Sequence, residues 1–159
     1  MFDALIKKIL SARVYDVATE SPVHLAPFLS KRLGRPVFFK REDLQPVYSF
    51  KCRGAYNKMV SIPKEILAKG VIAASAGNHA QGVALGAQKL KIPAIIVMPT
   101  TTPAIKVRSV KARGAQVVLH GDSFDEAFEK SQELVTEYGY TYLHPFDDAE
   151  VIAGQGTVA

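Results

Sequence analysis

From residue 51 onward, short apolar runs alternate with segments of helical periodicity. The apolar runs, each bounded by turn-forming residues, are Val71–Ala74, Ala94–Met98, Gln116–Leu119 and Tyr140–Leu143. Short runs that are apolar on both faces are typical of parallel strands buried between two layers of helices. The sequence therefore predicts an α/β fold with three layers, in which an open twisted parallel sheet carries helices on both faces.

The helical segments have recognisable start signals. Ser49 is placed to cap a helix over Lys51–Ser61, and Thr102, which is followed by a proline, should open another. Residues 123–126 have the spacing of a capping box, and His79–Leu90 has small residues along one face. These signals predict a helix after each strand.

Residues 1–50 have a different organisation, which we interpret as an N-terminal arm. An amphipathic helix is expected within residues 1–14, a second near Ala26–Leu33, and an apolar strand over Pro36–Lys40. We therefore expect three segments: the arm, an α/β unit over residues 51–145, and the start of a further segment over 146–159.

Composition excludes several classes of function. The chain has 159 residues, of which 48% are hydrophobic and 22% charged, with a net charge of +5. Its densest basic run, residues 106–113, has no stacking aromatics, so nucleic-acid binding is not expected. Cys52 is the only cysteine and the four histidines are far apart in sequence, so we expect neither a disulfide nor a metal site. No stretch of about 20 apolar residues suggests a membrane span, and a cytoplasmic location is the expectation.

Lys51 is the candidate nucleophile. Phe50 before it can present a flat apolar face, and Gly54 with Ala55 should leave room for a bulky group near the backbone. A nucleophilic lysine needs a lowered pKa, which desolvation or a neighbouring cation such as Arg53 can provide. A single lysine is more often a surface charge, so this segment gains weight only together with a second one.

That second segment is the loop Ser75–His79, between a predicted strand and a predicted helix. Ligands of parallel sheets bind at this location, and free N–H groups at a helix start attract carboxylates. Gly77 is expected to allow a turn that other residues cannot adopt, and Asn78 adds a donor and an acceptor. A plain turn needs only one or two such residues, so the run of five favours a binding loop.

Three other patterns have less informative interpretations. His79 could be a general base, but a positioning role is favoured because histidines at helix starts often make local hydrogen bonds. Cys52 has no base specified near it and is interpreted as a packing residue. Gly154-x-Gly156-x-x-Ala159 matches a dinucleotide-binding pattern without the preceding strand, and we interpret it as a chance match.

The segment Ser49-Phe50-Lys51-Cys52-Arg53-Gly54-Ala55 resembles the cofactor-lysine motif of the serine and threonine dehydratases. These are pyridoxal-phosphate enzymes of the tryptophan-synthase-β fold type. Ala74–Gly82 resembles their substrate-binding loop, and Val151–Thr157 follows in the order of that family. Sulfhydrylases and threonine synthases of the same fold type look different at the lysine and at the loop. The resemblance spans nearly the whole chain.

The resemblance implies a reaction and a set of roles. Lys51 would hold pyridoxal 5'-phosphate as a Schiff base and act on the α-proton of the substrate. Phe50 and Asn78 would contact the cofactor. The residues that would bind the substrate carboxylate are Ser75, Ala76, Gly77, Asn78 and His79. L-threonine would lose its β-hydroxyl and give 2-oxobutanoate and ammonia, in amino-acid metabolism and with isoleucine biosynthesis as the expected route.

Ala76 refines the implied reaction. In related serine racemases the matching position is a serine that exchanges a proton, which alanine cannot do. Elimination should therefore dominate over racemisation, with threonine as the preferred substrate.

The resemblance also implies how the chain is divided. Residues 1–50 would belong to a large domain, 51–145 would form the small domain, and 146–159 would begin a truncated large-domain segment. The glycine-rich phosphate loop of the family has no counterpart here, so a weakly active fragment of a homo-oligomeric enzyme is expected. A serine-preferring dehydratase and a non-catalytic α/β module are the alternatives.

Overall fold

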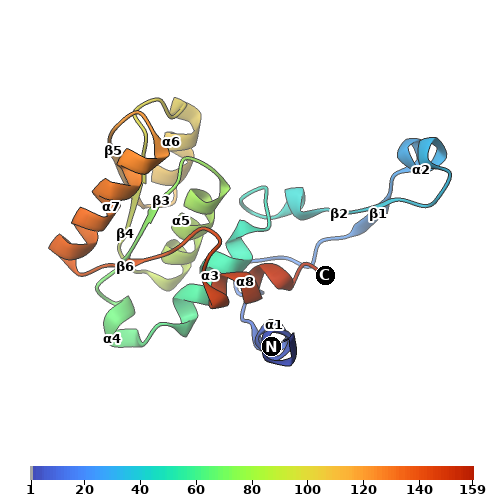
Figure 1. Cartoon of the computed structure of the whole chain (residues 1–159), viewed down its shortest axis with the longest axis horizontal. Helices are drawn as coiled ribbons and strands as arrows, with labels where there is room; N and C mark the ends of the chain where they lie inside the picture. The colour runs from blue at the N-terminus through green and yellow to red at the C-terminus, as the bar shows by residue number, and fades with distance from the viewer. Residues whose placement is uncertain (1) are drawn as a thin grey trace.

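A parallel four-stranded sheet forms the centre of the α/β part of the chain in the computed structural model, which describes residues 2–159 (Figure 1). Its strands are β3 (Val71–Ala74), β4 (Ala94–Met98), β5 (Gln116–Leu119) and β6 (Thr141–Tyr142). Their order is β5-β4-β3-β6, and every neighbouring pair is parallel. The predicted parallel sheet is therefore confirmed.

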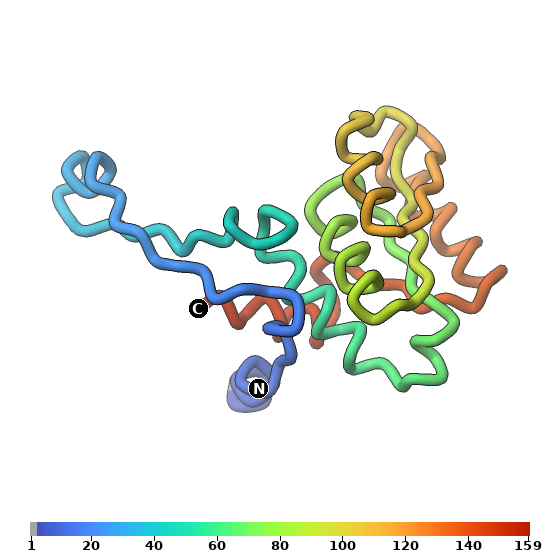
Figure 2. Tube along the Cα trace, turned by 180° about the vertical axis from the view of Figure 1, so that it is seen from behind, coloured from blue at the N-terminus to red at the C-terminus, as the bar shows by residue number. Residues whose placement is uncertain are grey.

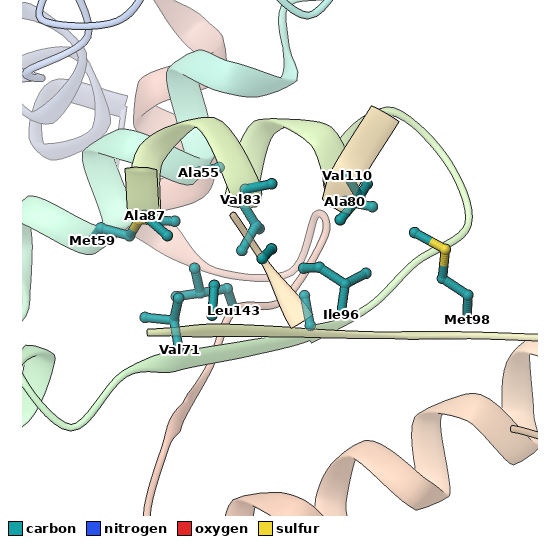
Figure 3. Close-up of a cluster of buried hydrophobic side chains, with 14 of the residues drawn as sticks. Ala55, Met59, Val71, Ala80, Val83, Ala87, Ile96, Met98, Val110 and Leu143 are labelled. Atoms are coloured by element: carbon teal, nitrogen blue, oxygen red, sulfur yellow. The ribbon is translucent and has the colours of Figure 1, made fainter. Parts of the chain in front are cut away.

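The two faces of the sheet pack against different helices. The helices are α3 (Lys51–Ser61), α4 (Lys64–Leu67), α5 (Asn78–Leu90), α6 (Ala104–Lys111) and α7 (Phe124–Tyr138). Along β4, Ile96 and Met98 pack with residues of α3, α5 and α6, whereas Ile95 and Val97 pack with α7. Figure 3 shows the first cluster, in which side chains of α5 lie over Val71, Ile96 and Leu143. Helices therefore cover both faces, as the apolar character of the strands predicts.

The winding of the sheet reverses between β3 and β6. The chain runs from β3 to β4 to β5 through α5 and α6, which lie on one face, and then crosses the other face through α7 to reach β6. β6 consequently pairs with the free side of β3. The carboxyl ends of β3 and β6 thus border the topological switch point, where open α/β sheets bind their ligands.

Helix α3 lies between α5 and α8 (Ala149–Gly156), and glycines line both contacts. A Cβ atom at Gly82 of α5 would lie 2.8 Å from the carbonyl oxygen of Lys51. A Cβ atom at Gly154 of α8 would lie 2.6 Å from the Cα atom of Gly54. These distances are too short for any side chain, so glycine is required for the helices to approach this closely.

Two expectations about glycines are decided by this packing. Gly54 was expected to leave room for a bulky group near the backbone, and it does, but α8 occupies that room with the Val151 carbonyl and the Gln155 side chain. The pattern Gly154-x-Gly156-x-x-Ala159 lies in and just after helix α8, so its interpretation as a chance match is confirmed.

The N-terminal arm has a part that projects from the rest of the chain, around residues 23–40, and a first helix that packs against α8, as Figures 1 and 2 show from opposite sides. It contains α1 (Phe2–Ser11), β1 (Val23–Leu25), α2 (Pro27–Leu33), β2 (Phe38–Lys40) and the 3₁₀ helix η1 (Glu42–Leu44). β1 and β2 pair antiparallel, and β1 was not predicted because a run of three residues carries little periodicity. The division into segments at residues 50 and 145 stays a prediction.

The helix starts show which caps the sequence could predict. The capping box at Ser123 and Glu126 is present, with each side chain bonded to the backbone of the other residue. Ser49 was expected to cap α3, but Phe50 holds that position, and the buried Ser49 hydroxyl has no partner in the described part of the chain. Thr102 likewise makes no cap hydrogen bond, because Pro103 occupies the position before α6.

None of the helices between residues 2 and 159 is both long enough and apolar enough to cross a lipid bilayer.

The contact between α3 and α8 can be tested through its glycines. We expect Gly154→Ala to lower the free energy of unfolding by about 1–3 kcal/mol, because the methyl group meets the α3 backbone. Gly77→Ala is the control, since no heavy atom of residues 2–159 outside the adjacent positions lies within 4 Å of the Cβ atom that it adds. Its effect should stay within about 0.5 kcal/mol. Equal effects of the two variants in urea unfolding would contradict the packing argument.

Candidate active site

The candidate site lies at the carboxyl ends of β3 and β6. The loop of residues 75–77 connects β3 to α5, and residues 143–147 follow β6. Because β3 and β6 are parallel neighbours, these two segments leave the same edge of the sheet side by side. Lys51 opens α3, and its backbone packs directly against Gly82 of α5. The fold thus brings the predicted lysine and the predicted loop to one place.

Lys51 is half-buried and its amine has a defined partner. Its Nζ atom donates a hydrogen bond to the carbonyl oxygen of Pro145 at 2.8 Å. Desolvation by burial lowers the pKa of Lys51 below its ordinary value of 10.5. A lowered pKa increases the fraction of neutral amine at a given pH, and the neutral amine is the nucleophile.

Arg53 does not contribute to that shift, contrary to one of the two expected causes. Its guanidinium is buried and pairs with Glu42, with Nε donating to Oε2 at 2.8 Å and Nη2 to Oε1 at 2.9 Å. Burial opposes the ionisation of Glu42, but hydrogen bonds from Arg53, Ser21 and Gln45 outweigh it and lower its pKa. The ion pair therefore ties the start of α3 to the arm.

The loop holds its shape through Ser75. The Ser75 hydroxyl oxygen accepts hydrogen bonds from the backbone N–H groups of Gly77 at 3.2 Å and Ala80 at 3.3 Å. Within residues 2–159, the N–H groups of Ala76, Asn78 and His79 have no protein acceptor. They lie at or just before the first turn of α5, where the helix dipole favours an anion. The loop can therefore bind a carboxylate through its backbone.

Gly77 provides space beside the loop. Its φ of −129° and ψ of −145° lie outside the left-handed region, and the expectation of a turn restricted to glycine stays a prediction. A Cβ atom added there would meet nothing within 4 Å. The surface beside the loop is consequently open at Gly77, and Asn78 next to it is exposed.

The His79 side chain is buried, with only 3% of its surface exposed. Its Nε2 atom lies 2.9 Å from the carbonyl oxygen of Leu143, and its Nδ1 atom is buried without a partner among residues 2–159. Burial lowers the pKa of His79 from 6.5 to about 4, so the ring is neutral near pH 7 and Nε2 donates to Leu143. This arrangement favours positioning over proton transfer, and only the backbone N–H of His79 is open to a ligand.

Phe50 and Cys52 flank the lysine in different environments. Phe50 is 40% exposed, and the Lys51 Nζ atom lies 5.6 Å from its ring centroid. Cys52 is fully buried, and desolvation raises the pKa of its thiol to about 11. The thiol stays protonated and unreactive, so the interpretation of Cys52 as a packing residue is confirmed.

Sequence reasoning missed the contribution of residues 143–147. The carbonyl groups of Leu143 and Pro145 bind His79 and Lys51, although a backbone carbonyl carries no sequence signature. One signal was available, since these residues directly follow the predicted strand Tyr140–Leu143. Ligand-site residues are expected at that end of a parallel strand.

Comparisons with known proteins place the chain in one family. Residues 14–159 match the family described as pyridoxal-phosphate dependent enzyme. The chain is 61% identical over 153 residues to the biosynthetic, chloroplastic threonine dehydratase 1 of Solanum lycopersicum, covering 96% of this chain and 25% of that protein. It thus spans about a quarter of the length of that curated relative.

Two solved structures are similar to most of the chain. The processed form of threonine deaminase isoform 2 from Solanum lycopersicum has a TM-score of 0.93 and 57% identity, covering 98% of this chain and 44% of that one. Maize serine racemase has a TM-score of 0.91 and 35% identity, covering 98% of this chain and 47% of that one.

The buried histidine predicts a pH dependence of stability. Between pH 6.5 and about 4 the unfolded chain binds a proton at His79 that the folded chain does not. The free energy of unfolding should therefore fall as the pH falls through this window, by up to about 3 kcal/mol in total. His79→Gln should flatten that decrease in urea titrations at pH 7 and 4.5. The exposed His120, changed to Gln, is the control and should leave the decrease intact.

Proposed function

We infer the function from one premise, which is that this chain belongs to the family of pyridoxal-phosphate dependent enzymes. We propose that it carries the reactive lysine and the carboxylate-binding loop of a threonine ammonia-lyase. The enzyme would convert L-threonine to 2-oxobutanoate and ammonia. The observation that carries this proposal is the position of the Lys51 amine, half-buried beside a loop with free N–H groups.

The residues present fit pyridoxal phosphate. A flat aldehyde needs a neutral amine, open space and an apolar surface. Lys51 offers the amine, the gap at Gly77 offers the space, and the Phe50 ring offers the apolar surface. When bound, the cofactor supplies a carbonyl carbon for the amine and a ring that accepts the electron pair of the broken C–H bond. The exposed amide of Asn78 adds a donor and an acceptor at the same edge.

Each residue then has a proposed role. The N–H groups of Ala76, Asn78 and His79 bind the substrate carboxylate, which fixes the orientation of the Cα–H bond. Lys51 Nζ takes the α-proton from that bond, because a neutral amine with a lowered pKa is a suitable base. Ser75 holds the loop through its two hydrogen bonds, and the buried ring of His79 holds Leu143.

Ala76 favours elimination. Racemisation requires a second group that returns a proton to the opposite face of Cα, and a methyl side chain cannot do this. The structural match to maize serine racemase makes a serine-directed reaction the second candidate. The higher identity to the tomato threonine dehydratase supports threonine.

The assembly and the location of the protein are also proposals. Homo-oligomer formation is expected and can be measured by sedimentation velocity. A cytoplasmic location was expected from the sequence, but the tomato relative is described as chloroplastic. Fractionation of the host cells distinguishes the two compartments.

The role of the lysine can be tested by covalent trapping. Pyridoxal phosphate followed by borohydride should attach a pyridoxyl group to Lys51, identified by peptide mapping. Lys51→Ala should lose the label, whereas Lys89→Ala, a change at an exposed lysine of α5, should retain it. Labelling of other lysines with Lys51 unmodified would refute the assignment.

The substrate can be tested by turnover in the polypeptide as the cell produces it. We expect 2-oxobutanoate from L-threonine to form with a higher kcat/KM than pyruvate from L-serine, and Lys51→Ala to abolish both. D-serine should not accumulate, because Ala76 has no proton to exchange. A preference for serine would support the second candidate, and D-serine formation would contradict the role of Ala76.

A further inference from the structure

The carbonyl group that binds Lys51 belongs to a turn fixed by His144. The Nδ1 atom of His144 accepts hydrogen bonds from the backbone N–H groups of Asp147 at 2.7 Å and Phe146 at 3.2 Å. Pro145 lies between the histidine and these two donors, and its carbonyl accepts from Lys51 Nζ at 2.8 Å. One side chain therefore closes the turn that presents the acceptor to the amine.

The His144 ring is held by its neighbours. It packs edge-on against Tyr142, with centroids 6.2 Å apart, and against Phe146, with centroids 4.6 Å apart. The Tyr142 ring in turn meets Phe128 of α7 at 5.5 Å. The orientation of the ring, and with it the direction of the Nδ1 lone pair, is thereby fixed to the sheet.

The turn is fixed on its other side as well. His79 donates to the carbonyl of Leu143, so the backbone is tied two residues before Pro145 and again one and two residues after it. Proline adds a restricted φ and has no N–H group of its own. The position of the Pro145 carbonyl is consequently determined by two histidines acting on backbone groups.

We propose that His144 is a positioning residue for Lys51. His144 fixes the turn of residues 144–147, and the turn holds the Pro145 carbonyl against the lysine amine. The proposal builds on the proposed function of Lys51 and adds to it a residue that touches neither cofactor nor substrate. Its basis is the pair of hydrogen bonds at Nδ1 and the single hydrogen bond at the amine.

The alternative is that His144 only packs, and two substitutions separate the possibilities. His144→Phe keeps an aromatic ring against Tyr142 and Phe146 but removes the acceptor. His144→Asn removes the ring but places an oxygen on Cγ, where the histidine has Nδ1. If His144 acts as an acceptor, the Asn variant keeps the fixed turn and the Phe variant loses it. If His144 only packs, the Phe variant keeps the turn and the Asn variant loses it.

Two measurements on the 159-residue chain need no cofactor. The first is hydrogen exchange of the Phe146 and Asp147 amides by NMR, which we expect to accelerate about tenfold or more in His144→Phe. The second is the pH profile of Lys51 acylation by acetic anhydride. Its midpoint should move up toward the ordinary value of 10.5, because an amine released from the turn is better hydrated.

The proposal requires that His144→Phe shows both the faster exchange and the raised acylation midpoint. His144→Asn should show neither change and should behave like the unmodified protein. His120→Phe, at an exposed histidine after β5, is the control and should alter neither measurement. Faster exchange with an unchanged acylation profile would overturn the proposal, as would equal behaviour of the Phe and Asn variants. Failure of pyridoxal phosphate to label Lys51 would instead refute the proposed function, and these two measurements would still decide the role of His144.

Discussion

The close approach of α3 to α5 and α8 is the contact on which the rest of the structure depends. The Lys51 backbone packs against Gly82 on one side of α3, and Gly54 packs against Gly154 on the other. Gly82 lies one turn beyond His79, so the same contact that buries α3 also brings Lys51 to the loop. The site therefore exists because helix packing and ligand-binding geometry share residues.

The two buried or half-buried cations near the site have different partners, an anion for Arg53 and a neutral carbonyl group for Lys51. The buried guanidinium of Arg53 is neutralised by Glu42, whose carboxylate accepts several further hydrogen bonds. Lys51 has a carbonyl partner instead, so desolvation acts on its amine without compensation from an anion. His79 stays neutral through burial. A carboxylate paired with Lys51 would favour its charged form, and the use of a neutral acceptor avoids this.

The sheet could be predicted because short, largely apolar runs alternate with helical segments, and the two central strands, β3 and β4, are buried along their whole length. The caps at Ser49 and Thr102 could not, since preferences for capping residues do not reveal which backbone position the chain adopts. Gly54 shows the same limit: a glycine indicates that space is needed, but the partner that fills it, here α8, comes from a distant segment. The Lys51 and loop motifs were recognisable, whereas the only signal for the carbonyl acceptor was its place after the predicted strand Tyr140–Leu143.

The acceptor for Lys51 is a main-chain atom, which has a consequence for mutational studies of this region. No side-chain replacement deletes a carbonyl group, so a scan that truncates residues one at a time would find no defect assignable to Pro145 itself beyond its ring. Any loss would be recorded at the neighbours that orient it. Such a scan would therefore record no loss at Pro145, which makes the contact. It would record losses at neighbouring residues whose side chains do not touch the Lys51 amine.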